Sequence, residues 1–351
     1  MVKRVTGKDV AARAGVTAAT VSYVLSGTAK RSVSKETRER VLLAARELGY
    51  VPDKTAKSLR RRETKTIGVA IDKNLATPRY ALALQGMSQT ASSMGYRLLL
   101  CHTGSGENGM ADYLNVFLER QVDGVIYVGA DNVGPNQDDI ETVERDGIPF
   151  VALDCQLNNP SLGSVDFDYR AGAREATSLL ISKRSSRVAY IRPAFESRQE
   201  SLREQGVIDA CRDAGIEQPL TIVAPIGAEA LTSFDRDPYD DHVGEPSSAH
   251  ARLIELPLSR LVNDGDLIVC SWAGWSGIVR VATGFTLSLY ADLANDLYSA
   301  FNANCYCVMP NYQAGKACVE QLVRQINGGP AAAKLLPIPA AQSYLLHLHD
   351  N

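Results

Sequence analysis

Apolar residues recur at helical spacing in three short stretches of the first fifty residues. The first stretch opens with Thr6 and Asp9, a hydroxyl and a carboxylate at the spacing that starts a helix. Gly15 can end it, because glycine takes a left-handed backbone without steric cost. The apolar face between them consists of Val10, Ala11 and Ala14. The pattern therefore predicts a short helix that packs on one side.

The second stretch follows directly, with Thr17 as the cap of a helix from Ala18 to Leu25. Its apolar positions are Val21, Val24 and Leu25, and its outward positions are Ala18, Ala19, Ser22 and Tyr23. Two short helices joined by a Gly-Val-Thr turn are typical of a helix-turn-helix. A third helix is predicted from a cap at Ser34 to Gly49. Its apolar stripe is Val41, Leu42, Ala45 and Leu48.

From residue 65 onward, apolar runs alternate with helical patterns. The predicted strands are 66–71, 97–101, 124–128, 149–153, 187–191 and 266–270. The predicted helices are 80–94, 110–120, 138–146, 170–182 and 196–214. A repeated strand–helix order indicates parallel sheets with helices on both faces. Ligands of such sheets bind beyond the carboxyl ends of the strands.

Charge divides the chain near residue 66. Residues 1–66 hold sixteen Lys and Arg against six Asp and Glu, a net of +10, although the whole chain carries −3. Such a density of positive charge on a small folded module is the electrostatic signature of nucleic-acid binding. A solvated basic tail is the alternative, and the regular helical pattern argues against it.

The remaining composition excludes several classes of protein. The chain has no run of eighteen apolar residues to span a membrane, and its N-terminus lacks an apolar signal segment. Seven scattered cysteines fit a reducing cytosol better than a disulfide framework. We therefore expect a cytoplasmic protein with no membrane partner.

Three further motifs suggest other chemistry, and each lacks a necessary part. Residues 104–109 have the letters of a dinucleotide fingerprint, but Asp123 precedes the next strand instead of ending it. The acidic stretch 224–250 lacks the glycine of a calcium loop. Cys305 and Cys307 have no second cysteine pair or histidine nearby to complete a zinc site. The five histidines form no triad or metal pattern, so the sequence predicts neither an enzyme nor a cofactor nor a metal site.

The amino-terminal motifs resemble those of one family. Residues 9–22, 33–41 and 48–52 are similar in order and spacing to the headpiece of LacI-type (lactose repressor/purine repressor) transcription regulators. The resemblance implies a small all-α helix-turn-helix headpiece over 1–51, a hinge over 52–64 and an α/β two-lobed body over 65–351. The body would be like a periplasmic sugar-binding protein, with parallel sheets covered by helices on both faces.

The resemblance also divides the body. The N-lobe would span about 65–160 and 310–328, and the C-lobe about 161–309 and 329–351. The chain would cross between the lobes near Asn158–Ser164, near Pro310 and near Gly328–Pro330.

In the family, the second helix reads the major groove and a leucine of the hinge opens a base step in the minor groove. Ala18 and Ala19 could touch thymine methyl groups here, while Tyr23 reads a base edge. Leu59 matches the hinge leucine, and Lys and Arg beside it would hold phosphates. The alternative is that residues 52–64 form a plain charged linker. The expected DNA-binding residues are Thr17, Ala18, Ala19, Thr20, Ser22, Tyr23, Lys30, Arg31, Ser32, Lys54, Ala56, Lys57 and Leu59.

Four positions match the effector cleft of the family, namely Tyr80, Asp154, Arg203 and Trp272. The chain departs from the family pattern where Trp272 and Ala273 replace an Asn-Asp pair. Ala291 stands where a second carboxylate is expected. Because buried polar groups discriminate sharply for hydroxylated ligands, these losses disfavour an ordinary hexose. Trp272 and Trp275 offer flat apolar area, which suits an aromatic, nucleobase or inositol-like ring, or a closed pocket with no ligand.

Together these observations predict a transcription regulator, more a repressor than an activator, that binds a near-palindromic double-stranded DNA operator as a homodimer. A small molecule between the lobes, such as a sugar, a nucleoside or a cyclic polyol, would control it. The alternative is the same regulator controlled by a protein partner, or with no small-molecule effector.

Overall fold

The computed structural model of the protein describes residues 5–26, 33–50, 63–106, 109–129, 134–155, 157, 159–184, 187–227, 256–295 and 303–342. The chain divides into two compact units, with the boundary in sequence between Thr64 and Lys65. Some predicted positions lie outside the described residues. They are Lys30, Arg31, Ser32, Lys54, Ala56, Lys57 and Leu59, with most of the acidic stretch 224–250.

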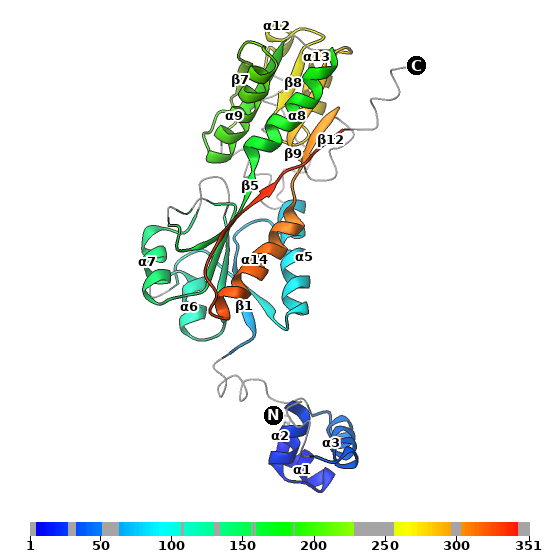
Figure 1. The fold of residues 1–351 in the computed structure, drawn as a ribbon, viewed down its shortest axis with the longest axis vertical. Coiled ribbons are helices and arrows are strands. Elements are labelled where there is room, and N and C mark those ends of the chain that lie inside the picture. Colours follow the sequence, from blue (N-terminus) through cyan, green and yellow to red (C-terminus); the bar gives the residue numbers. More distant parts are fainter. Residues whose placement is uncertain are drawn as a thin grey trace, which may run out of the picture. The chain divides into compact units, whose positions relative to one another are not determined.

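The first unit consists of three helices around a small apolar core (Figure 1). They are α1 (Gly7–Ala14), α2 (Ala18–Ser26) and α3 (Lys35–Glu47). The Asp9 carboxylate accepts hydrogen bonds of 2.7 Å from both the backbone N–H and the hydroxyl of Thr6. Gly15 takes the left-handed backbone that ends α1, and the Ser34 hydroxyl accepts the Thr37 N–H at 3.2 Å. The three predicted helices are confirmed.

One position of the predicted stripe on α3 is wrong. Leu42 is 42% exposed, and Ala44 lies in the core beside Val41 and Ala45. Each residue of a helix is rotated by about 100° from the one before it, so positions 41, 44, 45 and 48 share a face. Leu42 lies about 100° around the helix from Val41 and therefore faces outward.

The second unit contains two six-stranded sheets. The first has the order β11-β5-β4-β3-β1-β2, and all its strands are parallel. Its strands are β1 (Thr66–Ala70), β2 (Arg97–Cys101), β3 (Val125–Val128), β4 (Phe150–Leu153), β5 (Gly163–Asp168) and β11 (Ala333–Pro337). Strand residues alternate between faces, so Val69 packs with α5 and Ala70 with α6. Helices α5 (Pro78–Ser93) and α14 (Asn311–Ile326) cover one face, and α6 (Asp112–Leu118) and α7 (Gln137–Arg145) cover the other (Figure 1).

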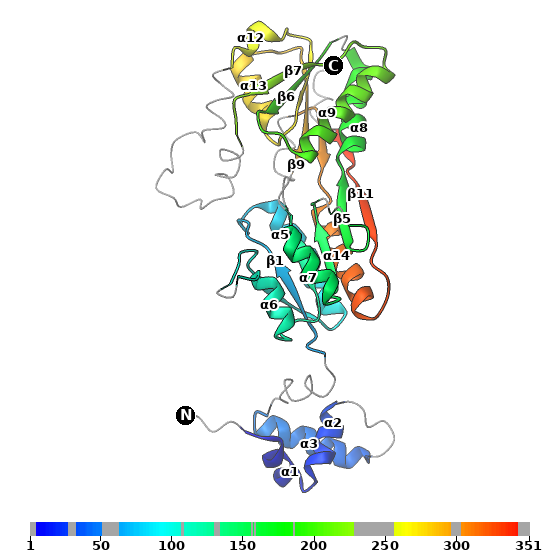
Figure 2. The same ribbon diagram turned by 90° about the vertical axis from the view of Figure 1, so that its left-hand side faces the viewer.

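The second sheet has the order β12-β10-β9-β8-β6-β7, in which only β12 runs antiparallel to its neighbour. Its strands are β6 (Val188–Pro193), β7 (Leu220–Ala224), β8 (Leu267–Cys270), β9 (Leu289–Asn295), β10 (Cys305–Val308) and β12 (Ala340–Gln342). Helices α8 (Tyr169–Arg184) and α9 (Arg198–Asp213) cover one face, and α12 (Leu258–Leu261) and α13 (Trp275–Thr283) cover the other (Figure 2). Within the described ranges, no helix has the length and apolar character to cross a bilayer.

The chain passes between the sheets at three places, and two of them differ from the prediction. It leaves the first sheet after Asp168, returns near Pro310 as predicted, and leaves again after Pro337. The crossing predicted near Asn158–Ser164 is wrong, because β5 begins at Gly163 and pairs with β4 and β11 of the first sheet. Gly328 turns the chain with a φ of 83° from α14 into β11, which still belongs to the first sheet.

Helices α5 and α14 touch backbone to backbone. A methyl group added at Gly315 would lie 1.9 Å from the carbonyl oxygen of Ala83, and one at Gly86 would lie 2.1 Å from that of Tyr312. Such a separation leaves no room for any side chain, so both positions require glycine. This contact fixes the start of α14 against α5 at the carboxyl edge of the first sheet.

The second unit begins at a firmly held residue, Lys65, whose φ of 54° is unusual for a side-chain-bearing residue. Its backbone N–H donates to Asp123 Oδ2 at 2.8 Å, and its carbonyl accepts from the N–H of Arg97 at 2.9 Å. Its Nζ lies 3.3 Å from the Tyr96 hydroxyl and 4.7 Å from the centre of that ring. Asp123 thus holds the entry of the chain into the sheet, which accounts for its place before β3.

Candidate functional site

The outward face of α2 consists of residues predicted to contact DNA. Ala18, Ala19, Ser22 and Tyr23 are all exposed, with Tyr23 exposed to 55%. The Thr17 hydroxyl accepts the backbone N–H of Thr20 at 3.2 Å and so caps the helix, as predicted. No residue of α2 is charged. The positive end of its dipole is therefore not neutralised by an acid within the helix and favours an anion such as a phosphate.

A second candidate site lies in the second unit, where the strands β3, β4 and β5 end. It is a small, half-open hollow. Its polar and aromatic walls are Arg79, Tyr80, Asp154, Phe167 and Asn311, and small or aliphatic residues complete it. Parallel sheets bind ligands at this edge. Two of the four predicted effector residues, Tyr80 and Asp154, line the hollow.

Asp154 is the centre of a buried polar cluster at the hollow. It follows β4 directly and has a left-handed φ of 56°, which costs a non-glycine residue roughly 1 kcal/mol or more. Its carboxylate forms an ion pair with the guanidinium of Arg79 and accepts the hydroxyl of Tyr169 at 2.9 Å. Arg79 Nη2 also donates to the Tyr169 oxygen at 3.2 Å. Burial, and then the negative charge of Asp154, raise the pKa of Tyr169, so its hydroxyl remains a donor.

Arg203 and Trp272, the other two predicted effector residues, lie in an adjoining cluster around Glu200. Arg203 Nη1 donates to Glu200 Oε1 at 2.6 Å, and the Trp272 indole N–H donates to the same oxygen at 2.7 Å. The hydroxyl of Tyr190 donates to the other carboxylate oxygen at 3.4 Å. Arg203 and Glu200 are each 2% exposed.

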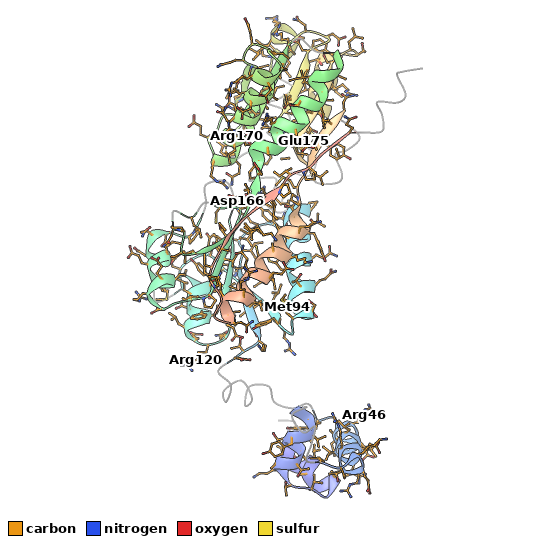
Figure 3. The ribbon with its side chains drawn as sticks, in the orientation of Figure 1. Arg46, Met94, Arg120, Asp166, Arg170 and Glu175 are labelled. Carbon is orange, nitrogen blue, oxygen red and sulfur yellow. The ribbon has the colours of Figure 1, made fainter. Side chains whose placement is uncertain are left out.

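Tyr169 connects the two clusters. Its hydroxyl donates to Asp154, while the guanidinium carbon of Arg203 lies 4.8 Å from the centre of its ring. Two further contacts join α9 to the first sheet. Gln199 Nε2 donates to the Asp154 carbonyl at 3.4 Å, and Arg198 pairs at 2.6 Å with Asp166, which Figure 3 labels on β5.

The structure therefore brings the four predicted effector positions into one region and adds partners that the sequence reasoning did not select. These are Arg79, Tyr169, Gln199 and Glu200. Glu200 stands one helical turn before Arg203, and this spacing was an available signal for a pair on one face of α9. Tyr169 was missed because β5, which positions it, was missed.

The second carboxylate of the family pattern, expected at position 291, lies one residue later in this chain. Ala291 lies buried in β9, and the carboxyl group belongs to the next residue, Asp292. Asp292 accepts hydrogen bonds from the backbone N–H groups of Gly274 and Ser276, both at 3.1 Å, and from the Ser276 hydroxyl at 2.8 Å. This acid therefore anchors the start of α13. Burial raises the pKa of Asp292 to about 7, although the bonds from Ser276 oppose the shift.

Asp292 is expected to make the stability of the second unit depend on pH. Its pKa in the folded chain exceeds the ordinary value of 3.8, so the stability that it contributes is complete below pH 4 and decreases until about pH 7. The loss should be on the order of a few kcal/mol. Urea unfolding followed by tryptophan fluorescence should show this decline in wild type but not in Asp292→Asn. Parallel pH curves for the two proteins would contradict the assignment.

Cys305 and Cys307 of β10 are both buried. The Cys307 thiol donates to the Gly172 carbonyl at 3.3 Å, and burial raises the pKa of this thiol. Both cysteines therefore belong to the packing between the second sheet and α8.

Comparison with known families gives two matches along the chain. Residues 6–53 match the model of bacterial regulatory proteins of the lacI family. Residues 64–225 match the model of periplasmic binding proteins and the sugar binding domain of the LacI family. The two matches correspond to the first unit and to the first part of the second unit.

Individual relatives agree with these two family matches. The chain is 31% identical over 210 residues to the HTH-type transcriptional repressor PurR of Photobacterium profundum, which is 60% of this chain and 61% of the relative. It is 31% identical over 214 residues to the ribose operon repressor of Escherichia coli, covering 61% and 63%. These matches thus span less than two thirds of the length of the relatives.

Solved structures share the fold over nearly the whole chain. The lac repressor dimer bound to operator and the anti-inducer ONPF superposes with a TM-score of 0.74 at 20% identity, covering 97% of this chain and 99% of that one. The complex of the transcriptional regulator CelR with cellobiose gives 0.59 at 23% identity, covering 97% and 99%. At such identities the likeness shows the architecture. The two family matches, together with these relatives, show that the chain belongs to the LacI family of bacterial regulatory proteins.

Proposed function

We propose that this protein is a sequence-specific DNA-binding transcription regulator, and a repressor. The observation that carries the proposal is the exposed, uncharged face of α2 on a strongly basic three-helix unit. Exposed Ala18, Ala19 and Tyr23 offer contacts to base edges, and the free helix dipole favours a phosphate. The names of the relatives, PurR and the ribose operon repressor, support the same activity.

The proposed partner is a near-palindromic duplex bound by two copies of the chain, in the bacterial cytoplasm. The lac repressor, whose fold this chain shares, was solved as a dimer on its operator. A two-fold symmetric dimer places two recognition helices on symmetric half-sites. Leu59 would enter the minor groove at the centre of the site. Regulation of this kind needs binding and no chemical step, so we propose no enzymatic activity.

The hollow at Asp154 is the proposed effector site. It combines a carboxylate and a guanidinium with the aromatic walls Tyr80 and Phe167, which suits a small polar ring such as a sugar, a nucleoside or a cyclic polyol. A ligand there would touch α5, which packs on the first sheet. It would also lie next to Tyr169, the first residue of α8, which packs on the second sheet. It could therefore bias how the two halves of the body align, and so couple to DNA binding.

A second candidate is the same regulator without a small-molecule effector, controlled by a protein partner. It is favoured by the fact that Asp154 and Arg203 already have intramolecular partners. Calorimetry of the full chain with sugars, nucleosides and polyols separates the two candidates. Saturable heat from one of them supports the effector, whereas no heat from any, with altered DNA binding in a cell extract, supports the protein partner.

Selection of bound sequences from random double-stranded DNA tests the proposed function. We expect an enriched near-palindrome with two half-sites around a flexible central step. Retention of no sequence above background would contradict the proposal. Leu59→Ala should bind the selected site more weakly than wild type, and equal binding would remove the minor-groove contact from the proposal.

Tyr23→Ala is expected to relax the base preference at one position in each half-site, at a cost of about 1–3 kcal/mol in discrimination. Ser22→Ala is the matched control on the same face of α2. We propose that Ser22 touches a phosphate, so Ser22→Ala should weaken binding equally on all sequences. Repeating the selection with each variant measures both effects. An equal loss on every sequence for Tyr23→Ala would make Tyr23 a phosphate contact instead.

A further inference from the structure

We infer that Glu200 determines the charge of the ligand that the cleft accepts. It gives Arg203 a permanent counter-charge, so that the body selects an uncharged ligand and rejects phosphorylated or carboxylated ones. The inference rests on the proposed effector site and specifies its substrate class.

The geometry places Glu200 between three donors. Its Oε1 accepts from Arg203 at 2.6 Å and from the Trp272 indole at 2.7 Å, and Oε2 accepts from Tyr190 at 3.4 Å. A ligand anion that approached Nη1 of Arg203 would have to displace this carboxylate. Displacement would leave a charge buried without its partner, which is strongly unfavourable.

The position of Arg203 makes its counter-charge necessary. The guanidinium lies 4.8 Å from the centre of the Tyr169 ring and 6.0 Å from that of Trp272, and the residue is 2% exposed. A cation withdrawn from water to this extent requires an anion at hydrogen-bond distance. Without Glu200, an anionic group of a ligand would meet this requirement. With Glu200 in place, the requirement is already met.

The other cations near the hollow are neutralised in the same way. Arg79 pairs with Asp154, and Arg198 pairs with Asp166 at 2.6 Å. Gln199 favours a ligand that donates a hydrogen bond. Its side chain is 1% exposed, and its Oε1 accepts no hydrogen bond from any residue that the structure describes. A buried amide acceptor favours a hydroxyl or amino donor over an anion.

Chemical rescue tests this role. Glu200→Ala leaves a space of about the size of a carboxylate beside Arg203. We expect sodium acetate at about 50 mM to raise the Tm of the full-length variant by about 4 °C more than sodium chloride of equal ionic strength. Wild type should show a difference of less than about 1 °C. Equal responses in the two proteins would overturn the inference.

The double variant Glu200→Ala/Arg203→Gln is the matched control. It removes the cation that demands an anion, so the acetate effect should disappear. An acetate effect that persisted in the double variant would overturn the inference, because it would not depend on Arg203. If Glu200→Ala fails to fold, Glu200→Gln serves instead, since its amide oxygen can still accept from Trp272. Glu200→Gln leaves no space for an added anion, so its readout is ligand selection: its preference for a phosphate ester over the neutral sugar should exceed that of wild type.

Ligand selection gives a second readout. D-Ribose and D-ribose 5-phosphate form a pair that differs by one phosphate group. The preference for the phosphate ester over the neutral sugar is expected to rise at least about tenfold in Glu200→Ala. Tighter binding of the ester to wild type would overturn the inference. DNA retention by the wild-type chain is measured separately, so loss of DNA binding would reject the proposed function and not the role of Glu200.

Discussion

Binding of the full chain to its selected duplex is expected to weaken about a thousandfold between 50 and 200 mM salt, since that is the loss typical of six or more phosphate contacts. The amino-terminal 66 residues carry the net charge of +10 that would make these contacts, whereas the remainder carries −13. Each cation that neutralises a phosphate releases a condensed counterion, so the logarithm of the affinity falls linearly with the logarithm of the salt concentration. A titration at five salt concentrations, followed by fluorescence anisotropy, measures the slope.

A surface cation of the second unit provides the control for this experiment. Arg174 is exposed on α8 and pairs with Asp213 at 2.6 Å. Arg174→Ala should leave the salt slope unchanged. Lys35→Ala, at the start of α3, should reduce the slope by about one if that residue neutralises a phosphate. Retention that does not respond to salt would contradict an electrostatic contact with DNA altogether.

Replacement of Gly315 by alanine is expected to destabilise the second unit by about 3 kcal/mol or more. The added methyl group would lie 1.9 Å from the Ala83 carbonyl oxygen, which belongs to the backbone of α5 and cannot rotate away. The two helices would have to separate along their whole contact. Since Asn311 at the start of α14 lines the hollow, the separation should also weaken any effector bound there.

Gly104→Ala is the control for this prediction, because a methyl group at Gly104 meets nothing within 4 Å and its φ lies outside the left-handed region. Urea unfolding should give a large loss of stability for Gly315→Ala and a change within about 0.5 kcal/mol for Gly104→Ala. Equal stabilities of the two variants would show that α5 and α14 can move apart without cost.

The elements that were predicted correctly have a strong local pattern. The cap at Ser34 and the glycine after Ala14 mark helix ends, because a side-chain hydroxyl or a left-handed backbone is needed there. Strand β5 was not predicted. Its outward positions are Ser164, Asp166 and Asp168, so it lacks the continuous apolar run of the central strands. Pairing with β4 and β11 from distant parts of the chain stabilises it, and no local window contains that information.

The candidate sites also differ in whether a local pattern or a distant contact defines them. The exposed face of α2 could be read from periodicity, since Val21 and Val24 define the buried side and therefore the opposite one. The cleft positions came from the resemblance alone. The pairing of Arg79 with Asp154 joins residues 75 positions apart, and that of Trp272 with Glu200 joins residues 72 apart. Such contacts depend on sheet order, which the alternation of strands and helices leaves open.

The attachment of Lys65 has a mechanical consequence. Its amide, its carbonyl and its ammonium group each have a partner within the first sheet or at its edge, on Asp123, Arg97 and Tyr96. A freely rotating joint at this point would absorb any twist of the sheet. A residue held at three atoms passes the twist to the peptide bond before it. Torque on the first sheet therefore reaches the peptide bond before Lys65, at the amino end of β1.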